Sequence, residues 1–406
     1  MKTPFFAAGL AILSASFAVL AAQTPASDAV TYRAARVLDG RGKVITNGVV
    51  EVKGSKIVAV DQRKGAVTHD LGNATLMPGM IDVHVHIDWH FQPNGLYGQR
   101  QGQERETAEQ ITKAIQANLD ATLDAGFTTV QSLGARGDKE IRDAINAGSR
   151  RGPRLLSSLG QLQPGTRTPE QLREQVKQLK AQGADVIKTF ASGSIRDGGK
   201  FSTTQAQMDA ICSEAKAQGL RSLVHAHDPE SILASVKAGC YEIEHGAYAD
   251  DASIAAMKAA NIYFDPNIGL VLQNYIENKD KYMGSGNYNE EGFAFMEKAV
   301  PTLLPIFKKA LAAGLKMPMG TDAVAGGHGQ NAREIITRVN GGGQKPMDAL
   351  VGATSLAAET LRMGDTIGTL AKGYEADMVV LNGDPLKDIS AVRSVKMVIK
   401  AGARVR

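Results

Sequence analysis

Cysteine is scarce in this sequence, since only Cys212 and Cys240 occur among its 406 residues. Two cysteines cannot form the disulfide framework that holds small secreted domains together, so the fold must rest on a hydrophobic core. In an oxidising compartment the two thiols could pair, and two separate buried thiols are an equally good interpretation. Neither cysteine lies in a sequence pattern with His and Asn or Asp that would indicate a catalytic nucleophile.

Clusters of positive charge are also missing. The net charge of +4 is spread over the chain, and no Lys/Arg-rich run or nucleic-acid-binding motif occurs. We therefore expect no nucleic acid partner and a small molecule as the substrate. The sequence also lacks a G-x-S-x-G pattern, which argues against the serine nucleophile of the α/β-hydrolases.

A long apolar run occurs only at the N-terminus, in MKTPFFAAGLAILSASFAVLAA. One Lys, an apolar stretch from Phe5 to Leu20 and small residues after it are typical of a secretory signal peptide, which we assign to residues 1–25 with cleavage between Ala21 and Ala26. A membrane anchor is the alternative, but the run is short for a span and its small-residue end favours cleavage. We expect a mature protein without a membrane segment, periplasmic or secreted.

Two β-rich flanks enclose a different middle. Residues 26–76 and 363–406 consist of short strand-like runs with Gly, Asn and Asp between them, and we expect them to form one small β-sandwich domain from both chain ends. Residues 77–362 alternate strand-like and helical stretches. The predicted strands are 80–87, 128–134, 154–160, 186–192, 222–228, 242–248, 262–268 and 316–322.

Eight strand–helix repeats predict an α/β fold in which residues 77–362 form a (β/α)8 TIM barrel. The polar, Gly-rich segment 273–292 is predicted either to cover the mouth of this barrel or to be a plain surface loop.

Polar residues interrupt the predicted apolar strands towards their C-terminal ends. The first strand, in GMIDVHVHIDWH, carries two histidines one residue apart, so both side chains leave the same face. Because a barrel builds its active site at the C-terminal ends of its strands, we expect all these side chains to meet there. The set comprises His84, His86, Lys188, His225, His227, His245 and Asp322.

This set fits two divalent metal ions, most simply Zn²⁺, because imidazole and carboxylate are ordinary zinc ligands. Two ions need a bridging ligand, and no Glu or Cys is suitably placed in the sequence. Lys188 could simply form a salt bridge. Burial and positive neighbours would instead favour its neutral amine, which can add CO₂ to become an anionic, bidentate carbamate.

These pieces together resemble the amidohydrolase superfamily, in particular the members with a binuclear metal centre and a carboxylated lysine. The matching segments are MPGMIDVHVH, the VIK of the fourth strand, VHAHD, IEHGAY, GTDA and DTIGTLAKGYEADMVVLNGDPL, in the family order from about residue 30 to the C-terminus. The resemblance implies a catalytic centre in which Asp322 and Lys188 are the key groups, and it implies a homo-oligomer.

The resemblance also implies the metal ligands. His84, His86 and Asp322 would hold the more buried ion, and His225 and His245 the more exposed one. Carboxylated Lys188 and a hydroxide would bridge the two. Asp322 would take the proton of the attacking hydroxide and pass it to the leaving amine.

The implied substrate is an amide with a free carboxylate on the leaving amino acid. The similar branch acts on N-acyl amino acids and on Xaa-Pro and Xaa-Arg dipeptides, and it includes bacterial hydrolases of ochratoxin A. His227 faces the site beside His225 by strand alternation, and His328 and Arg196 are further candidates for binding the substrate. The loop GQLQPGTRTPE after the third strand lacks the His found there in many dipeptidases of this branch.

Two other interpretations stay open at this point. The same binuclear centre could act on a lactone or a cyclic amide. The chain could also be a periplasmic binding protein without catalysis, against which the presence of every expected ligand argues. Metal content separates a binuclear hydrolase from a binding protein, because a binding protein need not hold two ions per chain.

Overall fold

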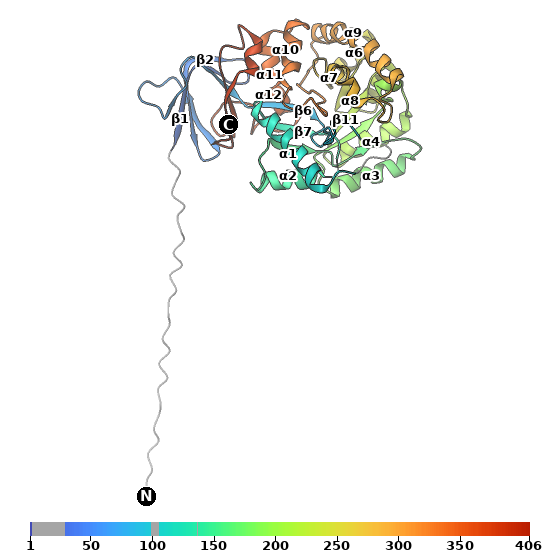
Figure 1. Ribbon diagram of the computed structural model, residues 1–406, viewed down its shortest axis with the longest axis horizontal. Coiled ribbons are helices and arrows are strands. Elements are labelled where there is room, and N and C mark those ends of the chain that lie inside the picture. Colours follow the sequence, from blue (N-terminus) through green and yellow to red (C-terminus); the bar gives the residue numbers. More distant parts are fainter. Residues whose placement is uncertain (2–28, 99–104, 136) are drawn as a thin grey trace.

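The computed structural model describes Met1 and residues 29–98, 105–135 and 137–406 (Figure 1). The predicted signal peptide lies, apart from Met1, outside the described residues. Among the helices that the structure does describe, none is long and apolar enough to cross a membrane.

Strands from both chain ends form one hydrogen-bonded sheet, at the left of Figure 1. Its strand order is β16-β15-β14-β5-β1-β2-β3, with β4 paired to β1. Residues near the N-terminus therefore pair with residues near the C-terminus, through the antiparallel contact of β14 with β5. The strands are β1 Val30–Leu38, β2 Val44–Lys53, β3 Lys56–Asp61, β4 His69–Asp70, β5 Thr75–Pro78, β14 Met378–Leu381, β15 Val395–Lys400 and β16 Ala403–Arg404.

Hydrogen bonds join all the described strands of this terminal sheet into a single sheet, so the predicted β-sandwich would form by folding of that sheet onto itself. Its two faces have different neighbours, as strand alternation requires. Met378 and Val380 pack in a core that belongs to the sheet itself, together with Ile57. Val379 and Leu381 pack against the middle of the chain in a second core.

The middle of the chain alternates parallel strands and helices. Two parallel sheets, β6-β7-β8 and β13-β12-β11-β10-β9, lie inside the surrounding helices (Figure 1). The strands are β6 Met80–Val85, β7 Phe127–Ser132, β8 Arg154–Ser157, β9 Gln161–Leu162, β10 Val186–Phe190, β11 Arg221–Ala226, β12 Glu242–His245 and β13 Tyr263–Asp265.

Seven of the eight predicted strands are present, each shorter than expected. The eighth, 316–322, is not a regular strand: isolated parallel bridges stand at its start, Tyr263↔Lys316, and directly after its end, Val85↔Ala323. Between them, single backbone hydrogen bonds such as Val83 N–H to Met319 O join it to β6. The sequence analysis also missed the short strand β9, which lies beside β10 in place of β8.

The helices begin where the sequence offers caps. Thr107, Thr168 and Thr204 each accept a hydrogen bond from the third residue of the following helix in a capping box. The helices are α1 Ala108–Asp124, α2 Asp138–Asn146, α3 Pro169–Ala181, α4 Gln205–Ala217, α5 Pro229–Lys237, α6 Asp251–Ala259, α7 Val271–Glu277, α8 Lys279–Tyr282, α9 Glu290–Ala312, α10 Ala332–Asn340, α11 Pro346–Gly352 and α12 Ser355–Thr360, with the 3₁₀ helices η1 Ile195–Asp197 and η2 Ile389–Arg393.

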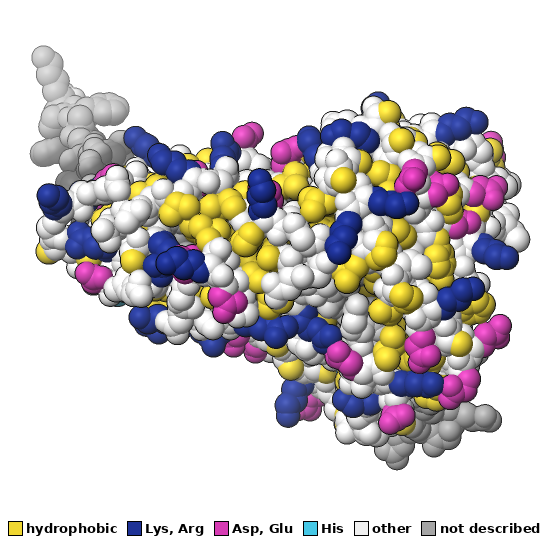
Figure 2. All heavy atoms as spheres, turned by 90° about the horizontal axis from the view of Figure 1, so that it is seen from above, with side chains coloured by type: hydrophobic (Ala, Val, Ile, Leu, Met, Phe, Trp, Pro, Cys, Tyr) yellow, Lys and Arg dark blue, Asp and Glu magenta, His cyan; other side chains and the backbone are white. Residues whose placement is uncertain are grey.

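The surface carries charges of both signs, scattered over the face seen in Figure 2. This pattern agrees with the even spread of charge along the sequence. It offers no broad positive area on that face for a nucleic acid.

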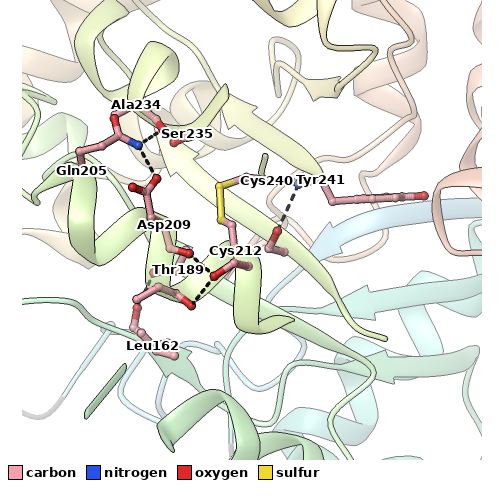
Figure 3. The surroundings of a disulfide bond; sticks show 12 residues. Leu162, Thr189, Gln205, Asp209, Cys212, Ala234, Ser235, Cys240 and Tyr241 are labelled. Atoms are coloured by element: carbon pink, nitrogen blue, oxygen red, sulfur yellow. Dashed lines mark hydrogen bonds between the residues drawn. A yellow bond between two sulfur atoms is a disulfide. The ribbon is translucent and has the colours of Figure 1, made fainter. Parts of the chain in front are cut away.

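Cys212 on α4 and Cys240, which precedes β12, are joined by a disulfide (Figure 3). Both side chains are buried, in the same core as Ile232 of α5. The bond closes a loop of 28 residues that contains β11 and α5. It therefore ties α4, which follows β10, to the short connection between α5 and β12.

We predict that replacing both cysteines by alanine lowers the free energy of unfolding by about 3–4 kcal/mol, because the open chain regains the entropy of a loop of this length. Chemical denaturation of the two proteins would measure the difference. A reductant should destabilise the wild type by a similar amount and leave the double variant unchanged. Equal stability with and without the disulfide would contradict the prediction.

Candidate metal centre

The polar side chains of the predicted set converge on one cavity of about 550 Å³. Its lining includes His84, His86, Lys188, His225, His227, His245, Asp322 and Arg196. Residues separated by up to 238 positions are thus brought together at the C-terminal ends of their strands. This is the side of a parallel α/β structure on which ligands bind.

Asp322 lies between the two histidines of the first strand. Its Oδ1 is 3.3 Å from His84 Nε2 and 3.1 Å from His86 Nε2, so both imidazoles point to the same carboxylate oxygen. Ligand atoms of His84, His245 and Asp322 all lie within 4.8 Å of one another. Three such atoms at this spacing can surround a single divalent ion.

The remaining histidines lie directly beside this group. The ring centroids of His225 and His245 are 4.6 Å apart, and those of His84 and His245 are 5.4 Å apart. His225 Nε2 is 3.1 Å from the carbonyl oxygen of Gly193. The ring centroid of His227 is 4.4 Å from that of His225.

Two of the ligand-type residues adopt a backbone conformation that costs free energy. His245 has φ 73° and Asp322 has φ 52°, both in the left-handed region that residues other than glycine rarely occupy. Such strain persists only where the surrounding structure holds it, and it occurs preferentially at functional sites. Both residues stand at the end of their strand segments, where the backbone turns into the loops around the cavity.

Burial sets the protonation of the site. It lowers the pKa values of His84, His225 and His245, so these imidazoles stay neutral and able to bind a metal. Burial also lowers the pKa of Lys188 to about 8, although Asp322 and other carboxylates oppose the shift.

Asp322 remains an anion. Burial raises its pKa, but His84, His86 and Lys188 more than reverse this effect and bring the pKa to about 2. A carboxylate beside imidazoles is a donor set that zinc and similar ions prefer.

Several of these groups lack hydrogen-bond partners. Both ring nitrogens of His84 and the Nδ1 of His86 are buried and make no hydrogen bond within the part of the chain that the structure describes. Buried polar atoms without partners are costly, and a bound cation would satisfy nitrogens that point into the cavity. The donor set therefore fits a metal.

The structure corrects one expectation about acidic residues. No Glu was expected near the centre, yet Glu244 on β12 forms an ion pair with Lys188, and its Oε1 lies 3.5 Å from His84 Nδ1. The side chain of Glu244 is fully buried and does not line the cavity, so it contacts Lys188 on the side away from the cavity. The acid in IEHG directly before the ligand-type His245 was a sequence signal for it.

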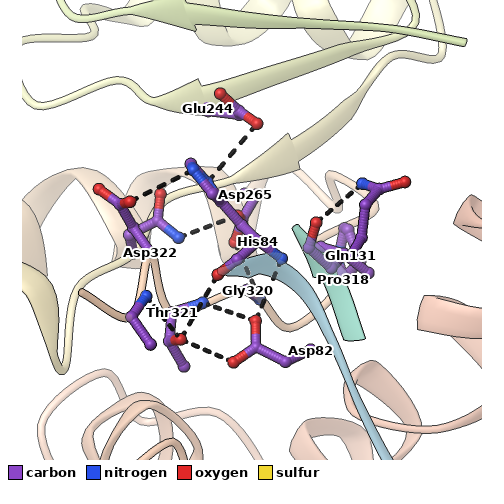
Figure 4. A network of polar contacts seen from close by, with 12 residues as sticks. Asp82, His84, Gln131, Glu244, Asp265, Pro318, Gly320, Thr321 and Asp322 are labelled. Carbon is purple, nitrogen blue, oxygen red and sulfur yellow. Dashed lines mark hydrogen bonds and ion pairs between the residues drawn. The ribbon is translucent and has the colours of Figure 1, made fainter. Parts of the chain in front are cut away.

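The loop segment that carries Asp322 is held by buried carboxylates, which the sequence analysis also missed (Figure 4). Asp82 accepts hydrogen bonds from the backbone N–H and the hydroxyl of Thr321, at 3.1 and 2.6 Å. Asp265 accepts one from the N–H of Gly320 at 3.0 Å. These side-chain contacts add to the backbone hydrogen bonds that join 316–322 to its neighbours, from Val83 N–H to Met319 O and from Phe264 N–H to Lys316 O.

The three predicted substrate-binding residues fall in different places. His227 and Arg196 line the cavity. His328 does not, because it lines a separate hollow with Ala121 and Arg406. The structure instead adds Trp89 and Tyr275 to the wall of the cavity, and neither was singled out from the sequence.

The model of the amidohydrolase family matches residues 75–405. The chain belongs to this family. Ochratoxinase of Aspergillus niger is 26% identical over 428 aligned positions, which cover 94% of this chain and 86% of the relative. Among solved structures, a Xaa-Pro dipeptidase with bound methionine in its active site superposes with a TM-score of 0.83 at 27% identity, covering 93% of this chain and all of the other.

A prolidase complexed with N-methylphosphonate-L-proline superposes nearly as well, with a TM-score of 0.81 at 25% identity over 93% of this chain and all of the other. The resemblance inferred from the sequence motifs is thereby confirmed. Family membership also agrees with the His and Asp cluster, because amidohydrolases use divalent metals.

We predict that adding Zn²⁺ to protein stripped with a chelator raises its unfolding temperature, because an ion that binds only the folded state stabilises it by about 4 kcal/mol at a concentration 1,000-fold above Kd. Thermal unfolding with and without zinc would measure this. His84→Ala should abolish most of the gain. His69→Ala, an exposed histidine in the terminal sheet, is the matched control and should keep it.

Proposed function

We propose that the protein is a metal-dependent amidohydrolase that cleaves the amide bond of an N-acyl amino acid or a dipeptide-like substrate. The convergence of five imidazoles, a lysine and an aspartate on one cavity carries this proposal. The family and the Xaa-Pro dipeptidase and ochratoxinase relatives support it.

The proposed centre holds two divalent ions, most simply Zn²⁺. His84, His86 and Asp322 would bind the inner ion, and His225 and His245 the outer one. Lys188, converted by CO₂ to a carbamate, would bind both. Its burial and lowered pKa support this chemistry, because only a neutral amine adds CO₂.

When bound, the ions would lower the pKa of a water molecule and polarise the scissile carbonyl group. The protein's own groups then move the proton. Asp322, an anion held between two imidazoles, would accept a proton from the attacking water and donate it to the leaving nitrogen. His227 would contact the substrate from the wall of the cavity.

The leaving group is proposed to be an amino acid with a free carboxylate. The bound methionine of the Xaa-Pro dipeptidase and the proline analogue of the prolidase support this assignment. Ochratoxin A, in which an amide joins phenylalanine to an isocoumarin acid, is the specific substrate suggested by the ochratoxinase relative.

The finer organisation is proposed on the same basis. The two parallel sheets and segment 316–322 would close into a (β/α)8 barrel, because backbone hydrogen bonds join that segment to β6 of one sheet and to β13 of the other. We also propose that the active enzyme is a homo-oligomer and that it is exported. The disulfide between Cys212 and Cys240 supports export, since such bonds persist in oxidising compartments.

The function is tested by a hydrolysis screen of zinc-loaded protein in bicarbonate, with N-acyl amino acids, Xaa-Pro and Xaa-Arg dipeptides and ochratoxin A. We expect amide cleavage that Lys188→Ala reduces by at least about 100-fold, because the bridging ligand is lost. Short carboxylic acids added to Lys188→Ala should restore part of the activity, since they can occupy the place of the carbamate.

Lys200→Gln, which removes a charge from an exposed lysine in the loop after β10, is the control and should keep full activity. If two ions bind but no amide is cleaved, the proposed bond is wrong, and a lactone or cyclic amide becomes the substrate to test. If no metal binds, the proposed centre is wrong.

Export is tested by expressing the full chain in a bacterium and fractionating the cells. We expect the protein in the periplasm or medium, with a mature N-terminus between residues 22 and 26 by mass spectrometry, because small residues there suit the cleaving peptidase. An intact Met1 on a membrane-bound protein would instead establish an anchor.

A further inference from the structure

One cation on the cavity wall has no counter-ion. Arg196, in η1 after β10, lines the cavity, and no carboxylate oxygen of the described residues lies within 4.0 Å of its guanidinium nitrogens. Among the described residues, the guanidinium makes a single hydrogen bond, from Nε to Asn287 Oδ1 at 2.7 Å. A guanidinium donates five N–H groups, so the terminal nitrogens remain available for a ligand.

The guanidinium is nevertheless firmly placed. It stacks on the ring of Tyr288 at 4.1 Å and lies 5.5 Å from that of Tyr275. Asn287 is oriented in turn, because its amide nitrogen donates to Asp197 Oδ2 at 2.8 Å. Stacking and one fixed hydrogen bond hold the planar fork of Arg196 in a single orientation, which suits bidentate binding of a carboxylate.

The neighbourhood of Arg196 is apolar. Val271, Leu272 and Tyr275, all on α7, line the same cavity, and the Tyr275 ring faces the guanidinium. An amino acid carries its carboxylate and its side chain on one carbon atom. A carboxylate bound by Arg196 would therefore bring that side chain close to the apolar wall of α7.

The lining also discriminates against positive charge. Asp322 is its only acidic residue among those described, and it is committed to His84 and His86. A cationic side chain would enter beside the fixed charge of Arg196, with Asp322 already committed to its own partners. Burial of such an unpaired charge is costly.

We propose that Arg196 is the specificity-determining residue for the substrate carboxylate, and that the enzyme takes N-acyl derivatives of apolar and aromatic amino acids and rejects those of arginine and lysine. This inference rests on the proposed amide hydrolysis and narrows its substrate class. It assigns a role to segment 271–288, which holds the guanidinium on one side and forms the side-chain pocket on the other.

The test compares N-acetyl-L-phenylalanine with N-acetyl-L-phenylalaninamide, in which the carboxylate is replaced by a neutral group of similar shape. Release of acetate is measured for both. Wild-type enzyme should prefer the acid by at least about 30-fold in kcat/KM, since a lost buried charge pair has about this effect. Arg196→Gln should remove this preference by weakening cleavage of the acid alone.

Arg196→Lys should restore part of the preference, because it keeps the charge but loses the fork and the stacking. Lys200→Gln removes the same charge four residues along the loop and should behave as wild type. N-acetyl-L-leucine should be cleaved at least about 10-fold better than N-acetyl-L-arginine. Equal loss of both phenylalanine substrates in Arg196→Gln, or a preference for the arginine derivative, would overturn the proposal.

A binding measurement tests the role of Arg196 separately from the proposed amide hydrolysis. If the wild type cleaves no amide, calorimetry of the zinc-loaded protein with the same acid and amide still tests Arg196. Tighter binding of the acid that is lost in Arg196→Gln would support the carboxylate site while the proposed reaction fails. Equal binding of acid and amide to the wild type would exclude the site.

Discussion

The candidate centre depends on two buried carboxylates that lie outside it. Asp82 and Asp265 bind the backbone of Thr321 and Gly320, and so fix the segment that presents Asp322. Arg338 completes the support, donating to the carbonyl oxygens of Met317 and Pro318 at 3.1 and 2.8 Å. Since Arg338 is charged, its hydrogen bonds are stronger than neutral ones, and they add to the few backbone hydrogen bonds of this segment.

This arrangement explains both the success and the failure of the sequence analysis. Histidines at i and i+2 in a strand must share a face, so the pair His84 and His86 was predictable from alternation alone. The eighth strand was not, because KMPMGTD reads as a strand only if its backbone pairs with its neighbours. In the structure that pairing consists of a few backbone hydrogen bonds, such as Val83 N–H to Met319 O, and side chains from distant positions supply the other contacts, which periodicity does not reveal.

The same distinction applies to the residues around the cavity. Arg196 could be proposed as a substrate-binding residue from its position in the loop after the fourth strand. Its stacking on Tyr288 was not predictable, because the two residues are 92 positions apart and no local pattern indicates that contact. His328 shows the opposite case. It follows the eighth strand like a site residue, yet the loop turns away and places it in another hollow. The terminal β domain was predictable from the two β-rich flanks, whereas its strand order depends on pairing between the chain ends, which no local pattern reveals.

The centre also illustrates how burial serves two opposite needs. A metal site requires neutral imidazoles and a neutral amine at Lys188, and burial favours both by penalising their charged forms. Asp322 requires the reverse, and it remains an anion only because His84, His86 and Lys188 surround it. Arg196 stays charged in any surrounding, since its guanidinium does not deprotonate in proteins. Burial that disfavours the charged forms of several bases, together with one fixed cation among the described lining residues, is what the proposed anionic substrate would need.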